Sequence, residues 1–81
     1  MLTIQRRFKL SIREGFEEEL AKVLDEFGVD FENVKYHSTK LGGKELVRAH
    51  FEGCSVLGNR FDGLIERLDK MSVRAGVVIV Y

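Results

Sequence analysis

Residues 31–52 read FENVKYHSTKLGGKELVRAHFE, and this stretch decides the fold. Gly42 and Gly43 separate two runs of alternating polarity, which predicts a β-hairpin closed by a two-residue turn with positive φ. If residue 41 pairs with residue 44, one face of the hairpin is mostly apolar. A slip of one residue would turn lysine and arginine into the core, so the pattern fixes the register. The expected pairs are Val34 with Phe51, Tyr36 with Ala49 and Ser38 with Val47 on the inner face, and Lys35 with His50 and His37 with Arg48 on the outer face.

Four further segments flank the hairpin. Residues 3–12 alternate with a period of two, with Arg6 as the single polar residue on the apolar side, and predict a strand. Residues 15–27 and 56–71 repeat apolar side chains at helical spacing and predict amphipathic helices. The last segment, 76–81, is a β-branched run without alternation, which is typical of a central or well-covered strand.

The resulting order is strand, helix, strand, strand, helix, strand. With both helices on one face, this order predicts an α+β fold, a ferredoxin-like βαββαβ sandwich with an antiparallel four-stranded sheet. The 81 residues suffice for one domain and not for two, so we expect a single domain over 1–81. The second face of the sheet is left to solvent or to a partner.

The net charge of zero is a cancellation between 13 basic and 13 acidic residues. Residues 1–13 carry +4, residues 14–32 carry −7 and residues 33–50 carry +3. Neutrality argues against a histone-like nucleic-acid binder, whereas the polarity along the chain suits self-association. No apolar run approaches the roughly 20 residues of a membrane span. No leader opens the chain, and the single cysteine, Cys54, fits a reducing compartment, so we expect a cytoplasmic location.

Residues 15–34, GFEEELAKVLDEFGVDFENV, resemble the signature stretch of ACT domains. Those small regulatory modules typically read D-x-P-G-x-L, a helix, and then G-I-N-I-x-x-V, and the spacing between Gly15 and Gly28 matches without a gap. The resemblance implies modules that pair through sheet edges or helices, and hence a homodimer. It also implies a small effector, often an amino acid, held by the first strand–helix turn and a neighbouring protomer's second strand.

The resemblance also implies a ligand-binding set. Gly15 takes the place of the family glycine, Phe16 follows it in the turn, and Asp30 takes the place of the family asparagine. The amides after the glycine would then receive a carboxylate at the helix N-terminus. The alternative is a glycine that only opens the helix. The departures from the family pattern are Ile12 for Asp, Glu14 for Pro and Glu17 for Leu.

The chain is also similar to the ACT-like cytosolic C-terminal domain of MgtC-type bacterial membrane proteins. That domain too lacks the proline–glycine ligand signature, and Lys44-Glu45-Leu46-Val47 after the hairpin turn and a late strand ending near an aromatic residue look similar. This resemblance implies a regulatory piece of a longer chain, joined to a membrane only through a fused domain.

A basic outer sheet face supports a competing hypothesis, an RNA- or phosphate-binding module. RNA-recognition modules use this face with exposed aromatic side chains. Here Phe8, Tyr36 and Phe51 point inward by the register, so nucleic acid is not the partner that we expect. The residues of this basic face are Arg7, Lys9, Lys35, His37, Arg48 and His50.

No residue pattern indicates catalysis, a cofactor or a metal. His37 and His50 fall at diagonal positions on adjacent strands, but cations lie between them and oppose a metal ion. The thiol of Cys54 has no neighbouring base at a recognisable spacing. We therefore expect a non-catalytic regulatory or assembly module without a cofactor, dimeric, with a small effector at the Gly15 turn as a further hypothesis.

Overall fold

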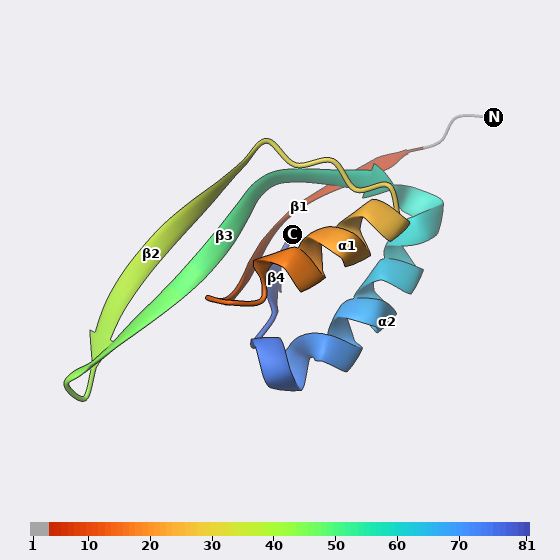
Figure 1. Ribbon diagram of the computed structural model, residues 1–81. Coiled ribbons are helices and arrows are strands. Elements are labelled where there is room, and N and C mark those ends of the chain that lie inside the picture. The colour runs from red at the N-terminus through yellow and green to blue at the C-terminus, as the bar shows by residue number, and fades with distance from the viewer. Residues whose placement is uncertain (1–3) are drawn as a thin grey trace.

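The computed structural model describes residues 4–81 and confirms the order of the elements (Figure 1). The strands are β1 (Gln5–Arg13), β2 (Asn33–Leu41), β3 (Lys44–Leu57) and β4 (Val78–Val80), and the helices are α1 (Glu17–Glu26) and α2 (Gly58–Ala75). The strands form one antiparallel sheet of order β2-β3-β1-β4. Both helices pack against the same face of this sheet, because their buried residues share one core with those of β1 and β3, so the expected ferredoxin-like α+β fold is confirmed.

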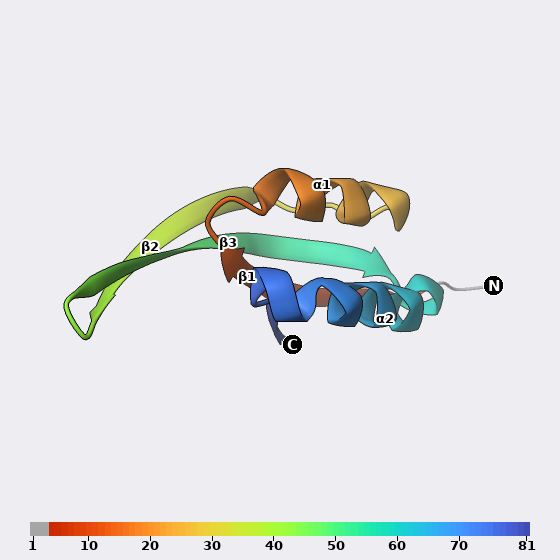
Figure 2. The same ribbon diagram turned by 60° about the horizontal axis from the view of Figure 1, so that its bottom comes forward.

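The β2–β3 hairpin has the register that the sequence predicts. Its nine pairs run from 33 with 52 to 41 with 44, and Gly42 and Gly43 close the turn at φ 60° and 81°. The hairpin extends past the ends of both helices, in a molecule that measures 53 × 23 × 19 Å (Figures 1 and 2). Tyr36, which the register turns towards the helices, is therefore 57% exposed instead of buried.

β3 is longer than predicted and contains a bulge. The prediction that the hairpin ends at residue 52 and a helix begins at 56 is wrong, because β3 continues to Leu57 and α2 begins at Gly58. The pairing with β1 shifts at residues 52–53, where Gly53 adopts φ 68°. The buried residues of β3 are Ala49 and Phe51 before the bulge and Cys54 and Val56 after it. The extra residue thus keeps both apolar pairs under the helices.

The prediction of a covered last strand is also wrong. β4 is a three-residue edge strand that pairs only with β1. Its middle residue, Ile79, packs against the core, while Val78 and Val80 are 51% and 56% exposed on the outer face. Gly76 does not start the strand but ends α2 in the left-handed conformation, at φ 61°, where its N–H donates to the Ser72 carbonyl at 2.7 Å.

The core lies between the two helices and the inner face of β1 and β3. Arg6, the polar exception of β1, lies with its guanidinium carbon 4.6 Å from the centre of the Phe61 ring. Arg48 donates to the hydroxyl of buried Ser11 at 3.0 and 3.2 Å, to the Ser11 carbonyl at 3.1 Å and to the carbonyl of Gly76. These bonds tie β3, β1 and the junction of α2 with β4 together.

Replacing Gly53 tests the bulge. We expect Gly53→Val to destabilise the fold by about 2 kcal/mol, because a β-branched residue adopts positive φ poorly. Gly53→Asn adds a side chain of similar size against the same neighbour, Glu32, and is expected to cost less because Asn tolerates this conformation. Urea unfolding of both variants measures the difference. If Gly53→Val leaves the free energy of unfolding unchanged or raises it, as a β-branched residue would in a regular strand, the bulge is contradicted.

Candidate functional site

The Gly15 turn joins β1 to α1. Gly15 adopts φ 99°, and Phe16 packs against the core at the start of the helix. Asp30 lies beyond the other end of α1, where its backbone exchanges hydrogen bonds with Ser55 at 3.0 and 2.8 Å. A helix of this length separates its two ends by about 15 Å. One chain therefore does not bring Asp30 to Gly15, and the two residues would meet only across two copies.

A carboxylate of the chain itself occupies the N-terminus of α1. Glu17 Oε1 accepts from the Gly15 N–H, and Glu17 Oε2 accepts from the Tyr36 hydroxyl at 3.0 Å. Burial raises the pKa of Glu17, but the hydrogen bonds from its own N–H, from Tyr36 and from the N–H groups of Gly15 and Phe16 outweigh burial and lower it. Glu17 thus supplies the negative charge that the ACT resemblance assigns to an effector.

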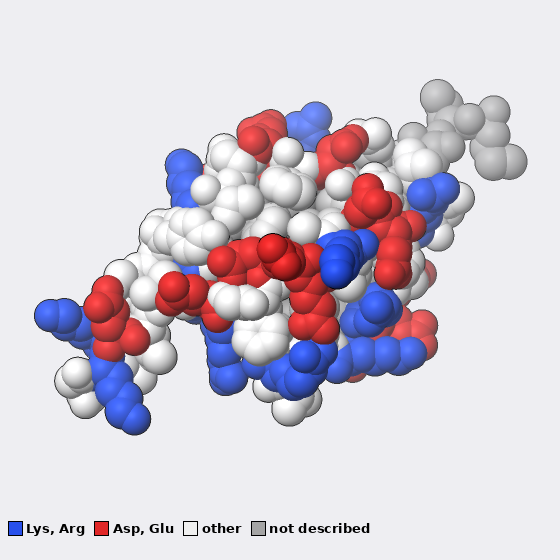
Figure 3. Space-filling model, viewed as in Figure 1, with Lys and Arg blue, Asp and Glu red and all other residues white. Residues whose placement is uncertain are grey.

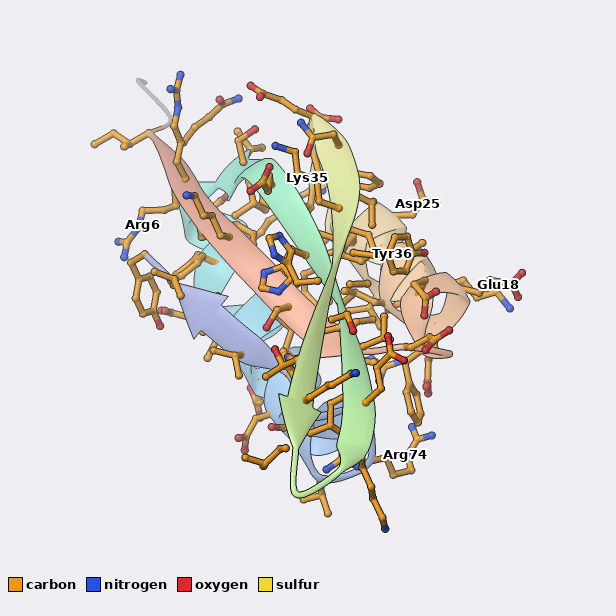
Figure 4. The ribbon with its side chains drawn as sticks, turned by 90° about the vertical axis from the view of Figure 1, so that its left-hand side faces the viewer. Arg6, Glu18, Asp25, Lys35, Tyr36 and Arg74 are labelled. Atoms are coloured by element: carbon orange, nitrogen blue, oxygen red, sulfur yellow. The ribbon has the colours of Figure 1, made fainter. Side chains whose placement is uncertain are left out.

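The six predicted basic residues lie on the outer sheet face, which Figure 4 shows from the front. Lys35 and Tyr36 point to opposite sides of β2, with Tyr36 on the side of α1 (Figure 4). The rings of His37 and His50 are in contact, with centroids 4.3 Å apart. Burial lowers the pKa of His50, and the charges of His37 and Arg48 lower it further.

Two of these basic residues already have partners in the fold. Lys35 Nζ lies 3.3 Å from a carboxylate oxygen of Glu52, and Arg48 is held by Ser11 and Gly76. Arg7 and Lys9 form no ion pair with any acid among residues 4–81. Of the four lysines and arginines among these six residues, the two without an ion pair or a described hydrogen bond therefore lie on the first half of β1.

A groove of about 450 Å³ opens beside Arg7 and Lys9, at the bulge of β3. Sequence reasoning missed this site, although an isolated Gly53 inside a strand pattern is a known signal of a bulge. The groove brings together residues from β1, β3, the segment before β2, and the end of β4. Its lining is Gln5, Arg7, Phe8, Lys9, Glu32, Gly53, Cys54, Ser55, Val80 and Tyr81.

Cys54 lines this groove, and its side chain is buried in the core. Burial raises the pKa of the Cys54 thiol to about 11, and its sulfur lies 3.4 Å from the Phe51 carbonyl oxygen, to which it donates. The thiol therefore stays protonated at neutral pH.

No group of three or more His, Cys, Asp and Glu side chains among residues 4–81 is placed to hold a metal ion. In the same part of the chain, neither helix is long and apolar enough to cross a membrane.

Comparison with solved structures shows three proteins of the same fold. An unknown protein from Galdieria sulphuraria superposes with a TM-score of 0.70 at 18% identity, over 93% of this chain and 47% of that chain. CPII, a nitrogen regulatory PII-like protein from Thiomonas intermedia K12 bound to ADP, AMP and bicarbonate, superposes with a TM-score of 0.58 at 15% identity. The match covers 98% of this chain and 91% of that chain. The regulatory subunit of aspartate kinase from Thermus thermophilus superposes with a TM-score of 0.55 at 10% identity. The match covers 99% of this chain and 55% of that chain.

At these identities the matches establish the fold alone. They include a regulatory subunit of aspartate kinase and a PII-like protein, which agrees with the expected ACT-like, ferredoxin-like fold. This chain spans about half the length of the Galdieria and Thermus chains. No family model and no curated protein matches the sequence. None of the three structures is described as an MgtC-type protein, so that narrower resemblance stays a prediction.

Removing the Glu17 carboxylate tests its role at the N-terminus of α1. We expect Glu17→Ala to cost about 0.5–1 kcal/mol, whereas Glu18→Ala, in the same turn without a hydrogen bond from its side chain to residues 4–81, changes stability little. Because the folded pKa of Glu17 is lowered, its contribution is present above the unfolded value near 4.5 and is lost as the pH falls below it. Thermal unfolding as a function of pH measures both effects, and equal losses in the two variants would contradict the assignment.

The histidine pair predicts a pH dependence of stability. The lowered pKa of His50 means that the fold favours its neutral form, so stability is full above the unfolded value of 6.5 and falls as the pH falls through the folded value. The groups around His50 are His37 and Arg48, which disfavour its charge, and Glu52, which favours it. We expect His50→Gln to flatten the loss of stability between about pH 7.5 and 5.5. His37→Gln is expected to reduce it in part, and an unchanged pH profile in His50→Gln would refute this account.

Proposed function

We propose that this chain is a non-catalytic, ACT-like regulatory and assembly module that pairs with a second copy through β2. The regulatory part is supported by the fold that it shares with the regulatory subunit of aspartate kinase and with a PII-like protein. A cytoplasmic location is part of the proposal, because the only cysteine, Cys54, is buried and cannot form a disulfide within the chain.

The free edge of β2 is the observation that carries the proposal. β2 pairs with β3 on one side only, and residues 33–41 contain neither a proline nor a shift of register. In an antiparallel ladder every second residue turns its N–H and C=O to the free side. Long regular edges of this kind pair readily with another strand. Two exposed apolar side chains, Tyr36 at 57% and Leu41 at 69%, accompany the edge.

The charges beside the edge favour a second copy as the partner. Acidic side chains gather over α1, as Figure 3 shows, and α1 lies beside β2, where Glu17 accepts from Tyr36. Lys40 lies on the same face of β2 as Tyr36. A two-fold antiparallel pair centred near Tyr36 would bring Lys40 of each copy towards the exposed Asp25 and Glu26 of the other. Basic side chains of β2 in each copy would then face acidic side chains of α1 in the other copy.

The Gly15 turn enters the proposal as a second, conditional site. Pairing through β2 centred near Tyr36 would bring the β2 of one copy near the α1 of the other, but it would place each Asp30 opposite the hairpin turn of the other copy, so the Gly15 turn would hold an effector without Asp30. A carboxylate effector there has to displace the carboxylate of Glu17 from the Gly15 N–H. The proposed module therefore needs an effector that binds more strongly than its own side chain, or it uses this turn for assembly alone.

A proline in β2 tests the pairing. Residues 41 and 44 close the turn as a hydrogen-bonded pair, so Leu41 and every second residue before it bond to β3. The residues between them, including Ser38, turn their N–H groups to the free edge. We expect the wild type to have twice the 9.3 kDa chain mass at micromolar concentration, and Ser38→Pro to have the mass of one chain. Size-exclusion chromatography with light scattering measures both masses.

Ser38→Ala is the matched control. It removes the hydrogen bond from the Ser38 hydroxyl to Glu45, 2.6 Å long, but keeps the backbone N–H, so it is expected to stay dimeric. Circular dichroism shows whether Ser38→Pro retains the fold. A wild type with the mass of one chain would overturn the assembly proposal, and a folded, dimeric Ser38→Pro would place the contact elsewhere than at this edge.

A further inference from the structure

The groove at the β3 bulge owes its shape to two interruptions of the sheet. β4 pairs with β1 only from Lys9 to Ser11, so residues 5–8 of β1 have a neighbouring strand on one side alone. On that side, the bulge at Gly53 breaks the regular pairing of β3. The resulting volume of about 450 Å³ lies in the range of small-molecule sites in proteins. It lies in the part of the sheet away from the hairpin tip.

Charges without partners line this groove. Arg7 and Lys9 lie two residues apart on β1, so their side chains leave the sheet on the same face. Neither lies within ion-pairing distance of an acid among residues 4–81, whereas Lys35 and Arg48, elsewhere on the outer face, are engaged within the fold. Two adjacent cations of this kind bind a carboxylate or a phosphate, Arg through two parallel hydrogen bonds and Lys as a point charge.

The other end of the groove accepts hydrogen bonds. The carboxylate of Glu32 lies over Gly53, where a Cβ atom would come within 2.6 Å of its side chain. Glu32 has no ion pair with a described cation, and its side chain has no hydrogen bond to another described residue. Ser55, which pairs with Arg7 across the strands, adds a hydroxyl. A carboxylate at this place repels a second anionic group and favours a hydroxyl donor.

We propose that the groove binds a small organic anion that carries hydroxyl groups, such as a hydroxy acid or a sugar phosphate. Arg7 and Lys9 hold the anionic group, and Glu32 and Ser55 hold the hydroxyls. Val80 and Tyr81 form the remaining wall of the groove. The absence of a side chain at Gly53 leaves room for Glu32 to face the groove. This site is distinct from the Gly15 turn and does not use the β2 edge.

Titration with matched probes tests the proposal. Malate and succinate carry the same two carboxylates, and only malate has a hydroxyl; glycerol 3-phosphate replaces the carboxylate by a phosphate. We expect malate or glycerol 3-phosphate to bind with saturation, with amide shifts in two-dimensional NMR confined to residues 5–9, 32, 53–55 and 80–81. Succinate is expected to bind more weakly than malate, because Glu32 repels the second carboxylate of both probes and only malate offers Glu32 a hydroxyl donor in return.

Variants separate the roles of the residues. The double variant Arg7→Gln with Lys9→Gln is expected to lose about tenfold or more in affinity. Its matched control, Lys44→Gln with Lys70→Gln, removes two exposed cations that belong neither to the groove nor to the proposed β2 contact, and it is expected to bind as the wild type does. Glu32→Ala is expected to bind succinate more tightly and to lose the preference for malate.

Three results would overturn the proposal. They are no saturable binding of malate or glycerol 3-phosphate, equal losses of affinity in the groove variant and its matched control, or shifts centred on Gly15 instead of the groove. All three are read from NMR titrations and not from the molecular mass. A chain that proves monomeric therefore leaves this test intact, and a failed titration leaves the pairing through β2 untouched.

Discussion

Both halves of β3 must turn their apolar side chains to the same two helices, and the rest of the fold depends on this requirement. A regular strand alternates with a period of two, so residues of odd and even number face opposite sides. Ala49 and Phe51 are buried, and so are Cys54 and Val56, which a regular strand could not achieve. One extra residue at Gly53 resolves the conflict. It lets β3 run through the whole domain, pairing with β2 in one half and with β1 over most of its length.

The charge polarity of the sequence is partly neutralised inside the fold. Glu19 of α1 lies 2.6 Å from Arg74 Nη2 of α2, and Glu26 lies 3.8 Å from Arg67 Nε. Such exposed pairs add little to the stability of the fold, because solvent screens their charges and holding two long side chains in one geometry costs entropy. The carboxylate of Glu17 is used at the start of its own helix. Fewer acidic side chains of α1 are therefore free to contact a second copy than the charge of −7 over residues 14–32 suggests.

The sequence predicts the features that follow from local periodicity. The hairpin register is correct at every pair, because Gly42-Gly43 and the alternation on both sides point to the same answer. The exposure of Tyr36 and Val78 could not be predicted in this way, since it depends on how far the helices reach over the sheet. The groove was missed for a related reason. Its residues come from four segments, and only Gly53, with the change of parity around it, marks the place in the sequence.

The groove and the β2 edge are close in the covalent chain, although we propose them for different partners. Glu32 immediately precedes β2, and its N–H donates to the Glu52 carbonyl at 2.9 Å, next to the bulge. A ligand that contacts both Arg7 and Glu32 would therefore bridge β1 and the start of the edge strand. Such a ligand regulates pairing only to the extent that its affinity differs between the single and the paired chain. By reciprocity, pairing then changes the affinity of the groove for the ligand by the same factor. If the single and the paired chain bind the ligand equally well, the two binding events are independent.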